Sequence, residues 1–171
     1  MKFGVVIGNP PYQKSISEEK LNSSLSKQLF PHYTVLSMEI STNLSSLIIP
    51  ARWFAGDAQD KSFLKLREFL KNKDTISDLY YYEDTNSIFN DVEIKGGVCY
   101  FLWDKEHNGD CEIISYRKDI KFEPVRRSLL ENGLNTFIRY NEAIPILKKV
   151  ISKKEKSFSD LVSVQTPFGF I

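Results

Sequence analysis

Four consecutive residues, Asn9, Pro10, Pro11 and Tyr12, combine groups that could hold a planar amine. The carboxamide oxygen of Asn9 is a hydrogen-bond acceptor, and the Pro10 carbonyl is a second acceptor whose direction the rigid ring fixes. Two acceptors aimed at one point suit an exocyclic NH₂ group. Binding both of its protons draws the nitrogen lone pair out of conjugation and makes it a better nucleophile. The Tyr12 ring could stack on a planar base, a contact worth about 1–3 kcal/mol. The tetrapeptide therefore predicts a site that activates a nucleobase amine toward an electrophilic methyl group.

The apolar run before this loop would position it. Val5–Gly8 shows no alternation of apolar and polar residues, which is typical of a parallel strand covered on both faces. Pro10 and Pro11 have fixed φ angles and no N–H group, so the chain must leave the sheet in a stiff loop. Open α/β sheets bind ligands at the carboxyl ends of such strands. We therefore expect a buried central strand with a ligand-binding loop at its end; a proline-rich turn without function is the plain alternative.

At these residues the sequence resembles a known family. Ile7–Tyr12 matches motif IV, the Asn-Pro-Pro-Tyr loop of gamma-class adenine-N6 DNA methyltransferases from type II restriction-modification systems. The resemblance implies S-adenosylmethionine as the methyl donor and double-stranded DNA with a flipped-out adenine as the substrate. It also implies catalytic roles for Asn9, Pro10 and Tyr12, which would orient and support the adenine, and a substrate-binding role for Pro11.

Two further segments carry the resemblance. Phe89, within residues 87–92, would be the motif VIII aromatic that helps to hold the flipped base; a core Phe at a strand entrance is the alternative. Pro50–Trp53 is similar to the family's Pro-x-Arg-Trp signature, from which Arg52 or Trp53 could line the mouth of the active site. The interpretation we favour has Trp53 packed on the following helix and Arg52 paired with a carboxylate.

Periodicity and turn residues predict the remaining elements. Tyr33, Leu36 and Ile40 form the expected buried face of a first helix, which Val35 and Met38 widen. Asn108–Gly109 is typical of a hairpin turn. Asp60 and Asn141 are expected to cap the later helices. The predicted helices are 30–43, 60–72 with the stripe Phe63, Leu66 and Leu70, and 141–153 with the stripe Ile144, Leu147 and Ile151; the predicted strands are 44–49, 76–82, 98–103 and 111–116; and 13–27 is expected to be a surface segment.

These elements and the resemblance together predict an α/β fold. It would be the C-terminal half of a Rossmann-like S-adenosylmethionine-dependent methyltransferase sheet, with parallel strands and an antiparallel edge hairpin formed by 98–103 and 111–116. Residues 1–156 would form the target-base part of a catalytic domain. Residues 157–171 would lead to an absent DNA-recognition region, because 166–170 is similar to a Pro-Phe-Gly segment that family members place just before that region.

Composition and charge limit the classes of function. At 171 residues and a net charge of +1, the chain has the length of a domain but no basic bias toward nucleic acid. Cys99 and Cys111 are too few and too isolated for a disulfide framework or a zinc site, which indicates reduced thiols and a cytoplasmic protein. No apolar stretch approaches the roughly 20 residues of a membrane span. We expect neither a metal nor a membrane partner.

The usual signals for binding the methyl donor are missing. This fold holds its donor with a Gly-rich turn after the first strand and an acidic residue after the second, and neither pattern occurs here. The family also usually carries Asp where this chain has Gly4. We therefore expect a part of a larger enzyme, inactive without its donor-binding half. An exposed sheet edge would make the isolated part prone to self-association.

Several alternatives remain open. The same loop could serve a methyltransferase that acts on a protein glutamine or an RNA amino group, and a non-catalytic interaction module could retain the fold. Asp84 with Glu93 and Lys95 has the skeleton of a metal-dependent nuclease, although three common residues at loose spacing often occur by chance. Lysines between positions 148 and 156 could contact phosphate, but a solvated helix end is the interpretation we favour.

Overall fold

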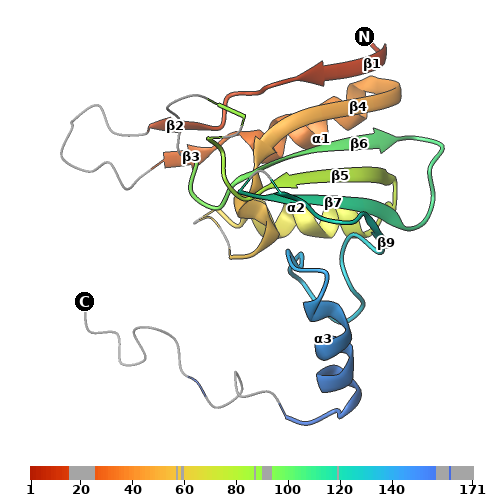
Figure 1. Cartoon of the computed structure of the whole chain (residues 1–171). Helices are drawn as coiled ribbons and strands as arrows, with labels where there is room; N and C mark the ends of the chain where they lie inside the picture. Colours follow the sequence, from red (N-terminus) through yellow and green to blue (C-terminus); the bar gives the residue numbers. More distant parts are fainter. Residues whose placement is uncertain are drawn as a thin grey trace. The chain divides into compact units, whose positions relative to one another are not determined.

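The computed structural model describes residues 1–15, 26–56, 58, 60–86, 88–89, 94–118, 120–156 and 162. The chain divides into two compact units, Met1–Arg139 and Tyr140–Ile171. Within the described residues, the first unit consists of β-strands, two α-helices and a short 3₁₀ helix, and the second contains one α-helix (Figure 1). The Pro-Phe-Gly segment at 166–170 lies outside the described residues.

The first unit is built on a mixed sheet, in keeping with the predicted α/β fold. Among the described residues it has seven strands in the order β1-β4-β6-β5-β7-β8, and β9 also pairs with β7. β1, β4, β5 and β7 run in one direction, whereas β6 is antiparallel to both of its neighbours, β4 and β5. The strands are β1 Phe3–Gly8, β4 Ser41–Pro50, β5 Ile76–Tyr82, β6 Val98–Asp104, β7 Cys111–Arg117, β8 Ile120–Lys121 and β9 Val125–Arg127.

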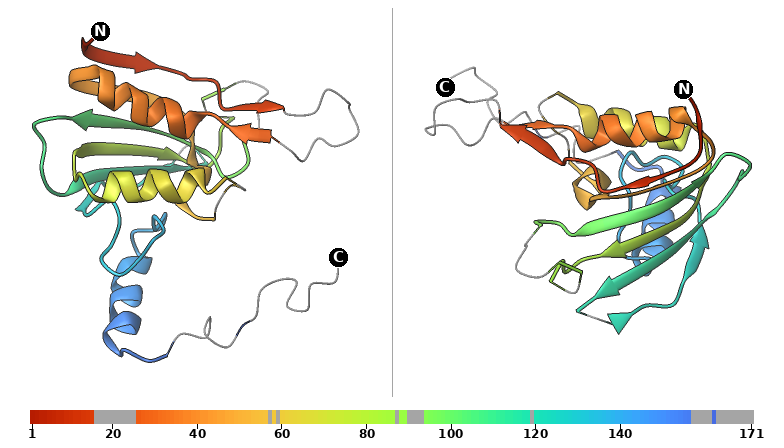
Figure 2. Two further views of the ribbon diagram at one scale, coloured as in Figure 1. Left: turned by 180° about the vertical axis from the view of Figure 1, so that it is seen from behind. Right: turned by 90° about the horizontal axis from the view of Figure 1, so that it is seen from above.

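Two helices of the first unit lie on the same face of this sheet (Figure 2). α1 spans Phe30–Ile40 and carries Pro31 in its first turn, where the missing N–H costs nothing. α2 spans Ser62–Lys71, and Asp60 Oδ1 accepts a hydrogen bond of 3.0 Å from the backbone N–H of Ser62. The predicted stripe of α2 is confirmed, since all three of its members are buried: Phe63, Leu66 and Leu70.

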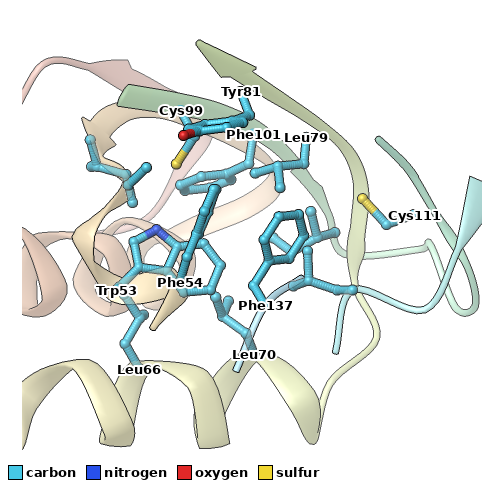
Figure 3. Packing of buried hydrophobic residues seen from close by; sticks show 14 of the residues in the cluster. Trp53, Phe54, Leu66, Leu70, Leu79, Tyr81, Cys99, Phe101, Cys111 and Phe137 are labelled. Carbon is cyan, nitrogen blue, oxygen red and sulfur yellow. The ribbon is translucent and has the colours of Figure 1, made fainter. Parts of the chain in front are cut away.

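Aromatic rings fill the core between the sheet and α2. The ring centroids of Trp53 and Phe54 are 4.9 Å apart, and those of Phe54 and Phe137 are 4.2 Å apart. Leu66 of α2 lies against this group from the helix side (Figure 3). Because Trp53 and Phe54 follow β4 directly, the core anchors the turn at the end of that strand.

The topology gathers three connections at one end of the sheet. β1 and β4 are parallel, with Gly8 opposite Leu47, so their carboxyl ends lie at the same end. β6 runs in the opposite direction, and Val98 at its start pairs with Pro50 at the end of β4. The loop after β1, the turn after β4 and the segment before β6 are therefore neighbours, in the position where open α/β sheets bind ligands.

β1 is a parallel strand, as predicted, but it is not central. It forms an edge of the sheet and pairs only with β4 among the described strands. Val5 and Ile7 are 56% and 76% exposed, so the prediction of a buried strand is wrong for this chain. An unbroken apolar run shows that the side chains of a strand can be buried without cost, but not that they are buried. Burial also requires covering elements, and the described residues supply a neighbouring strand on one side only.

The expected hairpin between β6 and β7 is also wrong. Both strands are present, but β5 lies between them and pairs with each. The connection at 105–110 steps across the start of β5, where the Gly109 N–H donates to the Asp74 carbonyl at 3.2 Å. Asn108–Gly109 is therefore a turn in a crossing connection. An antiparallel hairpin does occur at this side of the sheet, formed by β7 and β8.

The predicted buried face of α1 is confirmed at Met38, which is buried, and wrong at Tyr33 and Leu36, which are 40% and 46% exposed. Two further buried positions, Thr34 and Ser37, are polar. The hydroxyl of Ser45 on β4 donates to Ser37 Oγ at 2.8 Å, so a polar pair is satisfied beneath the helix. Small side chains allow the helix to lie close to β4. This contact, rather than the apolar spacing, determines which face of α1 is buried.

The second unit contains α3, Ala143–Ser152. Its N-cap residue is Glu142 rather than the predicted Asn141, and no side-chain cap hydrogen bond is formed. Of the predicted stripe, Ile144 is buried but Ile151 is 43% exposed. No helix in the described parts of either unit has the length and apolar character needed to cross a membrane.

Candidate functional site

A cavity of about 510 Å³ lies where the three connections meet. Small-molecule sites commonly have volumes of roughly 300–1,000 Å³, so this one could hold a ligand the size of a nucleotide. Its wall includes all four residues of the predicted loop. Its lining residues are Asn9, Pro10, Pro11, Tyr12, Gln13, Gln28, Pro50, Arg52 and Ile94. The structure thus brings the Asn-Pro-Pro-Tyr loop and the Pro-x-Arg-Trp signature to one site.

A short two-stranded ribbon forms one wall of the cavity. β2, Gln13–Ser15, pairs antiparallel with β3, Ser26–Gln28, beyond the end of β1 (Figure 1). The side chain of Gln28 is buried, and its Nε2 donates to Gln13 Oε1 at 3.4 Å. The sequence predicted only a polar surface segment at 13–27, because strands of three residues are too short to show alternation. Residues 16–25 lie outside the described residues.

The backbone of Tyr12 connects the loop to α1. Its carbonyl accepts hydrogen bonds from the N–H groups of Leu29, at 2.9 Å, and Phe30, at 3.4 Å. Phe30 is fully buried at the start of α1. The end of the Asn-Pro-Pro-Tyr loop is therefore fixed to the core, which gives the cavity wall a defined position.

The side chain of Tyr12 offers a ring rather than an acid or a base. It is half-buried and packs against the hydrophobic core. Burial and, to a smaller extent, the field of Cys99 raise the pKa of the phenol, whereas the neighbouring Asn9 side chain acts in the opposite direction. The phenol is therefore neutral at physiological pH, and its contribution to a bound ligand is its ring face.

In the turn after β4, the side chains of Arg52 and Trp53 lie in different environments. Within the 3₁₀ helix η1, Ala51–Phe54, Trp53 is 1% exposed, and its carbonyl accepts a hydrogen bond of 2.7 Å from Arg67 of α2. This confirms that Trp53 packs against the following helix. Arg52 lines the cavity instead. In the described part of the chain no carboxylate pairs with Arg52, and because Asp57 and Glu93 lie outside the described residues, the pairing stays a prediction.

The segment between β5 and β6 contributes Ile94 to the cavity, whereas Phe89 is not among the lining residues. Phe89 is half-buried in a turn, where its N–H donates to the Thr85 carbonyl at 2.8 Å. Gly97 fixes this segment, since its N–H donates to the Ile94 carbonyl and its own carbonyl accepts from the Ala51 N–H, each at 2.9 Å. The position of Phe89 in the sequence, relative to the other family motifs, therefore does not determine which side chain of this long connection reaches the cavity.

The residues of the nuclease alternative are only partly visible. Glu93 lies outside the described residues. Asp84 Oδ1 accepts a hydrogen bond of 3.0 Å from the Asn86 N–H, which is a local turn contact. Across the described ranges, no group of three or more His, Cys, Asp or Glu side chains is placed to hold a metal ion. Asp84 thus has a structural role in its turn.

Both cysteines are buried free thiols. Burial raises the pKa of Cys99 to about 12, although the Trp53 indole and Arg139 act in the opposite direction (Figure 3). Burial likewise raises the pKa of Cys111 to about 12, with the Asp78 carboxylate adding to the effect. At neutral pH both side chains are uncharged packing residues, not nucleophiles.

The lining residues define what the cavity can bind. Carboxamides supply hydrogen-bonding groups, the prolines, the Tyr12 ring and Ile94 supply apolar surface, and no carboxylate is among the described lining residues. A flat ligand that offers N–H donors would satisfy these acceptors while its faces contact the ring and the apolar side chains. A nucleobase has these properties.

The first half of the chain is similar to a known protein family. The family model described as Eco57I restriction-modification methylase matches residues 1–89, which include the loop and the Pro-x-Arg-Trp signature. A Mycoplasma pneumoniae protein described as an uncharacterized adenine-specific methylase is 31% identical over 139 residues, which are 79% of this chain and 32% of the relative. The chain therefore spans about a third of the length of that relative.

A solved structure supports the fold. The methyltransferase subunit of a type I restriction-modification system from Streptococcus thermophilus superposes with a TM-score of 0.50. The sequences are 14% identical, and the match covers 91% of this chain and 33% of that one. At this identity the likeness establishes the architecture and nothing about the chemistry.

Proposed function

Because the chain belongs to the Eco57I restriction-modification methylase family, we propose that it is the target-base part of an adenine-specific DNA methyltransferase. The complete enzyme, of a type II restriction-modification system, would transfer a methyl group from S-adenosylmethionine to the N6 amine of adenine. The observation that carries the proposal is the joint placement of Asn9, Pro10 and Tyr12 on one cavity. Its substrate would be double-stranded DNA with the adenine flipped out of the stack, in the cytoplasm.

Asn9 and Pro10 would act on the amine. The Asn9 carboxamide oxygen and the Pro10 carbonyl would each accept a hydrogen bond from one N–H of the N6 amine, which localises the nitrogen lone pair and aims it at the methyl group. As the nitrogen attacks, positive charge develops on it, and two oxygens already in place stabilise that charge. Catalysis would then come from orientation and fixed dipoles rather than from a general base within this loop.

Tyr12, Pro11 and Phe89 would support the base. The neutral Tyr12 ring would stack on one face of the adenine, and Pro11 would close the cavity beside it. Phe89 lies outside the lining of the cavity, so it can contact the base only if its segment rearranges on binding. Ile94 of the same segment is the residue that lines the cavity in this structure.

The residues described here fit the acceptor side of the reaction and not the donor side. S-Adenosylmethionine would supply an electrophilic methyl group. Neither a Gly-rich turn between a strand and a helix nor an acidic residue after a following strand is found next to the cavity in the described ranges. We therefore derive no step through the donor, and we expect this chain alone to be inactive.

Reconstitution would test the proposal. The chain would be mixed with, or fused to, the donor-binding half of a family member, and N6-methyladenine in DNA would be measured by mass spectrometry. We expect product with the unmodified chain and a loss of about 10²–10³-fold with Asn9→Ala, the size typical of removing one preorganised group from a charge-stabilising site. Asn43→Ala, an exposed position on β4, is the matched control and should leave the rate unchanged.

The same assay separates the other substrates. Methylation of RNA or of glutamine peptides, without methylation of DNA, would replace the proposal with one of those alternatives. A reconstituted protein that folds and binds S-adenosylmethionine but methylates none of these acceptors would favour a non-catalytic interaction module.

We also propose that the isolated chain self-associates through the free edge of β1. Among the described strands, β1 has no neighbour on this side, and Phe3, Val5 and Ile7 are 42%, 56% and 76% exposed. Sedimentation velocity should show dimers or larger species that grow with concentration, and Val5→Lys should reduce them. Val150→Lys, at a 63% exposed position of α3, is the control. A monomer at every concentration would contradict this proposal.

A further inference from the structure

We propose that Arg52 binds the phosphate group of the nucleotide whose base occupies the cavity, and so positions that base against Asn9. The inference rests on the proposed function and extends it from the base to the backbone of the substrate. Three observations carry it: the partners of the other arginines, the charge of the cavity, and the way in which the 3₁₀ helix η1 holds Arg52.

The arginines differ in how their guanidinium groups are used. In the described part of the chain, every arginine except Arg52 has a hydrogen bond, an ion pair or an aromatic ring as partner, and Arg52 has none. Arg52 is half-buried on the wall of the cavity, so its guanidinium is available to a ligand that enters it. The partnered residues are Arg67 with the Trp53 carbonyl, Arg117 with Glu83, Arg126 with Glu112, Arg127 with Glu131, and Arg139 with the rings of Phe54 and Tyr81.

Arg52 supplies the charge of the cavity. Among the described lining residues it is the one charged side chain, and the others are amides, prolines, Tyr12 and Ile94. A guanidinium can stack on a neutral base or donate to its ring nitrogens, but an anionic oxygen group gains more from it, namely charge attraction together with a fork of parallel hydrogen bonds. The cavity is therefore suited to a ligand with an uncharged planar part and an anionic part.

The turn after β4 holds Arg52 firmly. Its neighbours Ala51, Trp53 and Phe54 are all at most 1% exposed, so the core fixes the backbone of η1 on both sides of Arg52. The Ala51 N–H is also bonded to the Gly97 carbonyl. A guanidinium on such a support can fix the distance between a phosphate and a base, as a side chain on a loose loop cannot.

The phosphate is favoured over the other anion of the proposed reaction, the carboxylate of the methyl donor. Arg52 shares its cavity with Asn9, Pro10 and Tyr12, the residues that would hold the base. A nucleotide's own phosphate is tethered to its base through one sugar, so both groups can occupy a single cavity of this volume. The donor carboxylate is an outcome of the test below.

Binding of mononucleotides to the full chain would test the inference. The probes are 2′-deoxyadenosine and 2′-deoxyadenosine 5′-monophosphate, followed by NMR, with the Arg52 side-chain Nε–H as a local reporter. We expect the monophosphate to bind about tenfold or more tightly than the nucleoside, and Arg52→Gln to remove that difference. Arg52→Lys should restore part of it, because the charge remains but the planar fork does not. Arg126→Gln is the control, since Arg126 is exposed and pairs with Glu112 away from the cavity.

The outcomes separate this inference from the proposed function. If both compounds bind equally, and binding needs Asn9, the role of Arg52 is wrong and the base site stands. If the chain binds every nucleoside monophosphate with the same affinity, this affinity depends on Arg52, and Asn9→Ala has no effect, then the anion site stands and the adenine site is wrong. If Arg52→Gln weakens binding of S-adenosylmethionine and not of the monophosphate, the ligand is the donor carboxylate and our assignment is overturned. If neither compound binds at millimolar concentration, both assignments are wrong for this chain.

Discussion

Tyr12 contributes to the cavity through its ring, because its hydroxyl is buried beside the Asn9 side chain and makes no hydrogen bond of good geometry in the described part of the chain. Removal of an unsatisfied buried hydroxyl costs little or even stabilises a protein, whereas removal of the ring would expose core residues and remove a stacking surface. The two effects can be separated by two substitutions at this one position.

We predict that Tyr12→Phe binds 2′-deoxyadenosine within about threefold of the unmodified chain, and that Tyr12→Ala binds it about tenfold or more weakly. Since the phenol pKa is raised above its ordinary value of 10, the hydroxyl stays protonated below that pH. The affinity should therefore be constant between pH 7 and about 9.5. Titrations at several pH values check this. If the affinity changes with pH as the phenol ionises, and Tyr12→Phe abolishes this change, the hydroxyl takes part in binding.

At the scale of elements, the turn before β6 depends on one glycine. Gly97 has a φ of +81°, and a Cβ atom there would lie 2.2 Å from the Tyr82 carbonyl oxygen. Gly96 next to it has a similar φ of +90°, but a Cβ atom there would meet only Arg139 Nη2, at 3.5 Å. Substitution of Gly96 therefore measures the cost of a left-handed backbone alone, and substitution of Gly97 measures that cost together with the cost of a steric clash.

We predict that Gly96→Ala lowers the free energy of unfolding by about 1 kcal/mol, the usual cost of a positive φ for a residue with a side chain. Gly97→Ala should cost at least about 2 kcal/mol more, because the Tyr82 carbonyl must move. It should also disturb the cavity, since the Gly97 carbonyl accepts the Ala51 N–H beside Arg52. Urea denaturation measures the free energy of unfolding of both variants. If both lose the same amount, the clash at Gly97 is relieved without cost and the prediction is wrong.

A ladder of tyrosines crosses β5, β6 and β7. The rings of Tyr80 and Tyr100 stack at 4.5 Å, and those of Tyr82 and Tyr116 stack at 4.3 Å. These side chains alternate along β5 with the buried Leu79 and Tyr81, so they lie on the face of the sheet opposite α1 and α2. Burial, followed by a hydrogen bond with Tyr100, raises the pKa of Tyr82.

This ladder makes stability fall at high pH. The folded state holds the Tyr82 proton more tightly than the unfolded state, so the stabilisation is complete below pH 10 and is lost as the pH rises through the folded-state pKa. The buried thiols act in the same direction from about pH 9 upward. Urea midpoints of the unmodified chain should therefore fall above pH 10. Those of Tyr82→Phe should fall less, and those of the exposed control Tyr140→Phe should follow the unmodified chain. Parallel curves for all three would contradict the assignment.

Across the whole molecule, the sequence predicted which segments form helices and strands better than it predicted which elements lie beside them. Ile76–Tyr82 was predicted as β5 with its bounds, and the buried stripe of α2 was confirmed, because both depend on local periodicity. The edge position of β1, the insertion of β5 between β6 and β7, and the exposed face of α1 depend on which elements lie beside them. Neither composition nor periodicity contains that information.

The candidate site divides in the same way. Asn9, Pro10, Pro11 and Tyr12 were found because a rigid tetrapeptide after a strand carries its own geometry. Gln13, Gln28 and Ile94 were missed, since they reach the cavity through a three-residue ribbon and a long connection that have no sequence pattern. For Arg52, the parallel register of β1 and β4 could have indicated the cavity, because it places the residues after both strands at one end of the sheet.

We propose that this molecule holds an adenine by both protons of its N6 amine. The most direct test of this proposal is the affinity of the full chain for 2′-deoxyadenosine and for N6,N6-dimethyl-2′-deoxyadenosine, measured by NMR titration with Asn9→Ala and Asn43→Ala beside the unmodified chain. We predict that the dimethyl compound, which has no N6 proton to donate, binds about tenfold or more weakly, and that Asn9→Ala alone removes the difference. Equal affinity for the two nucleosides in the unmodified chain would contradict the claim.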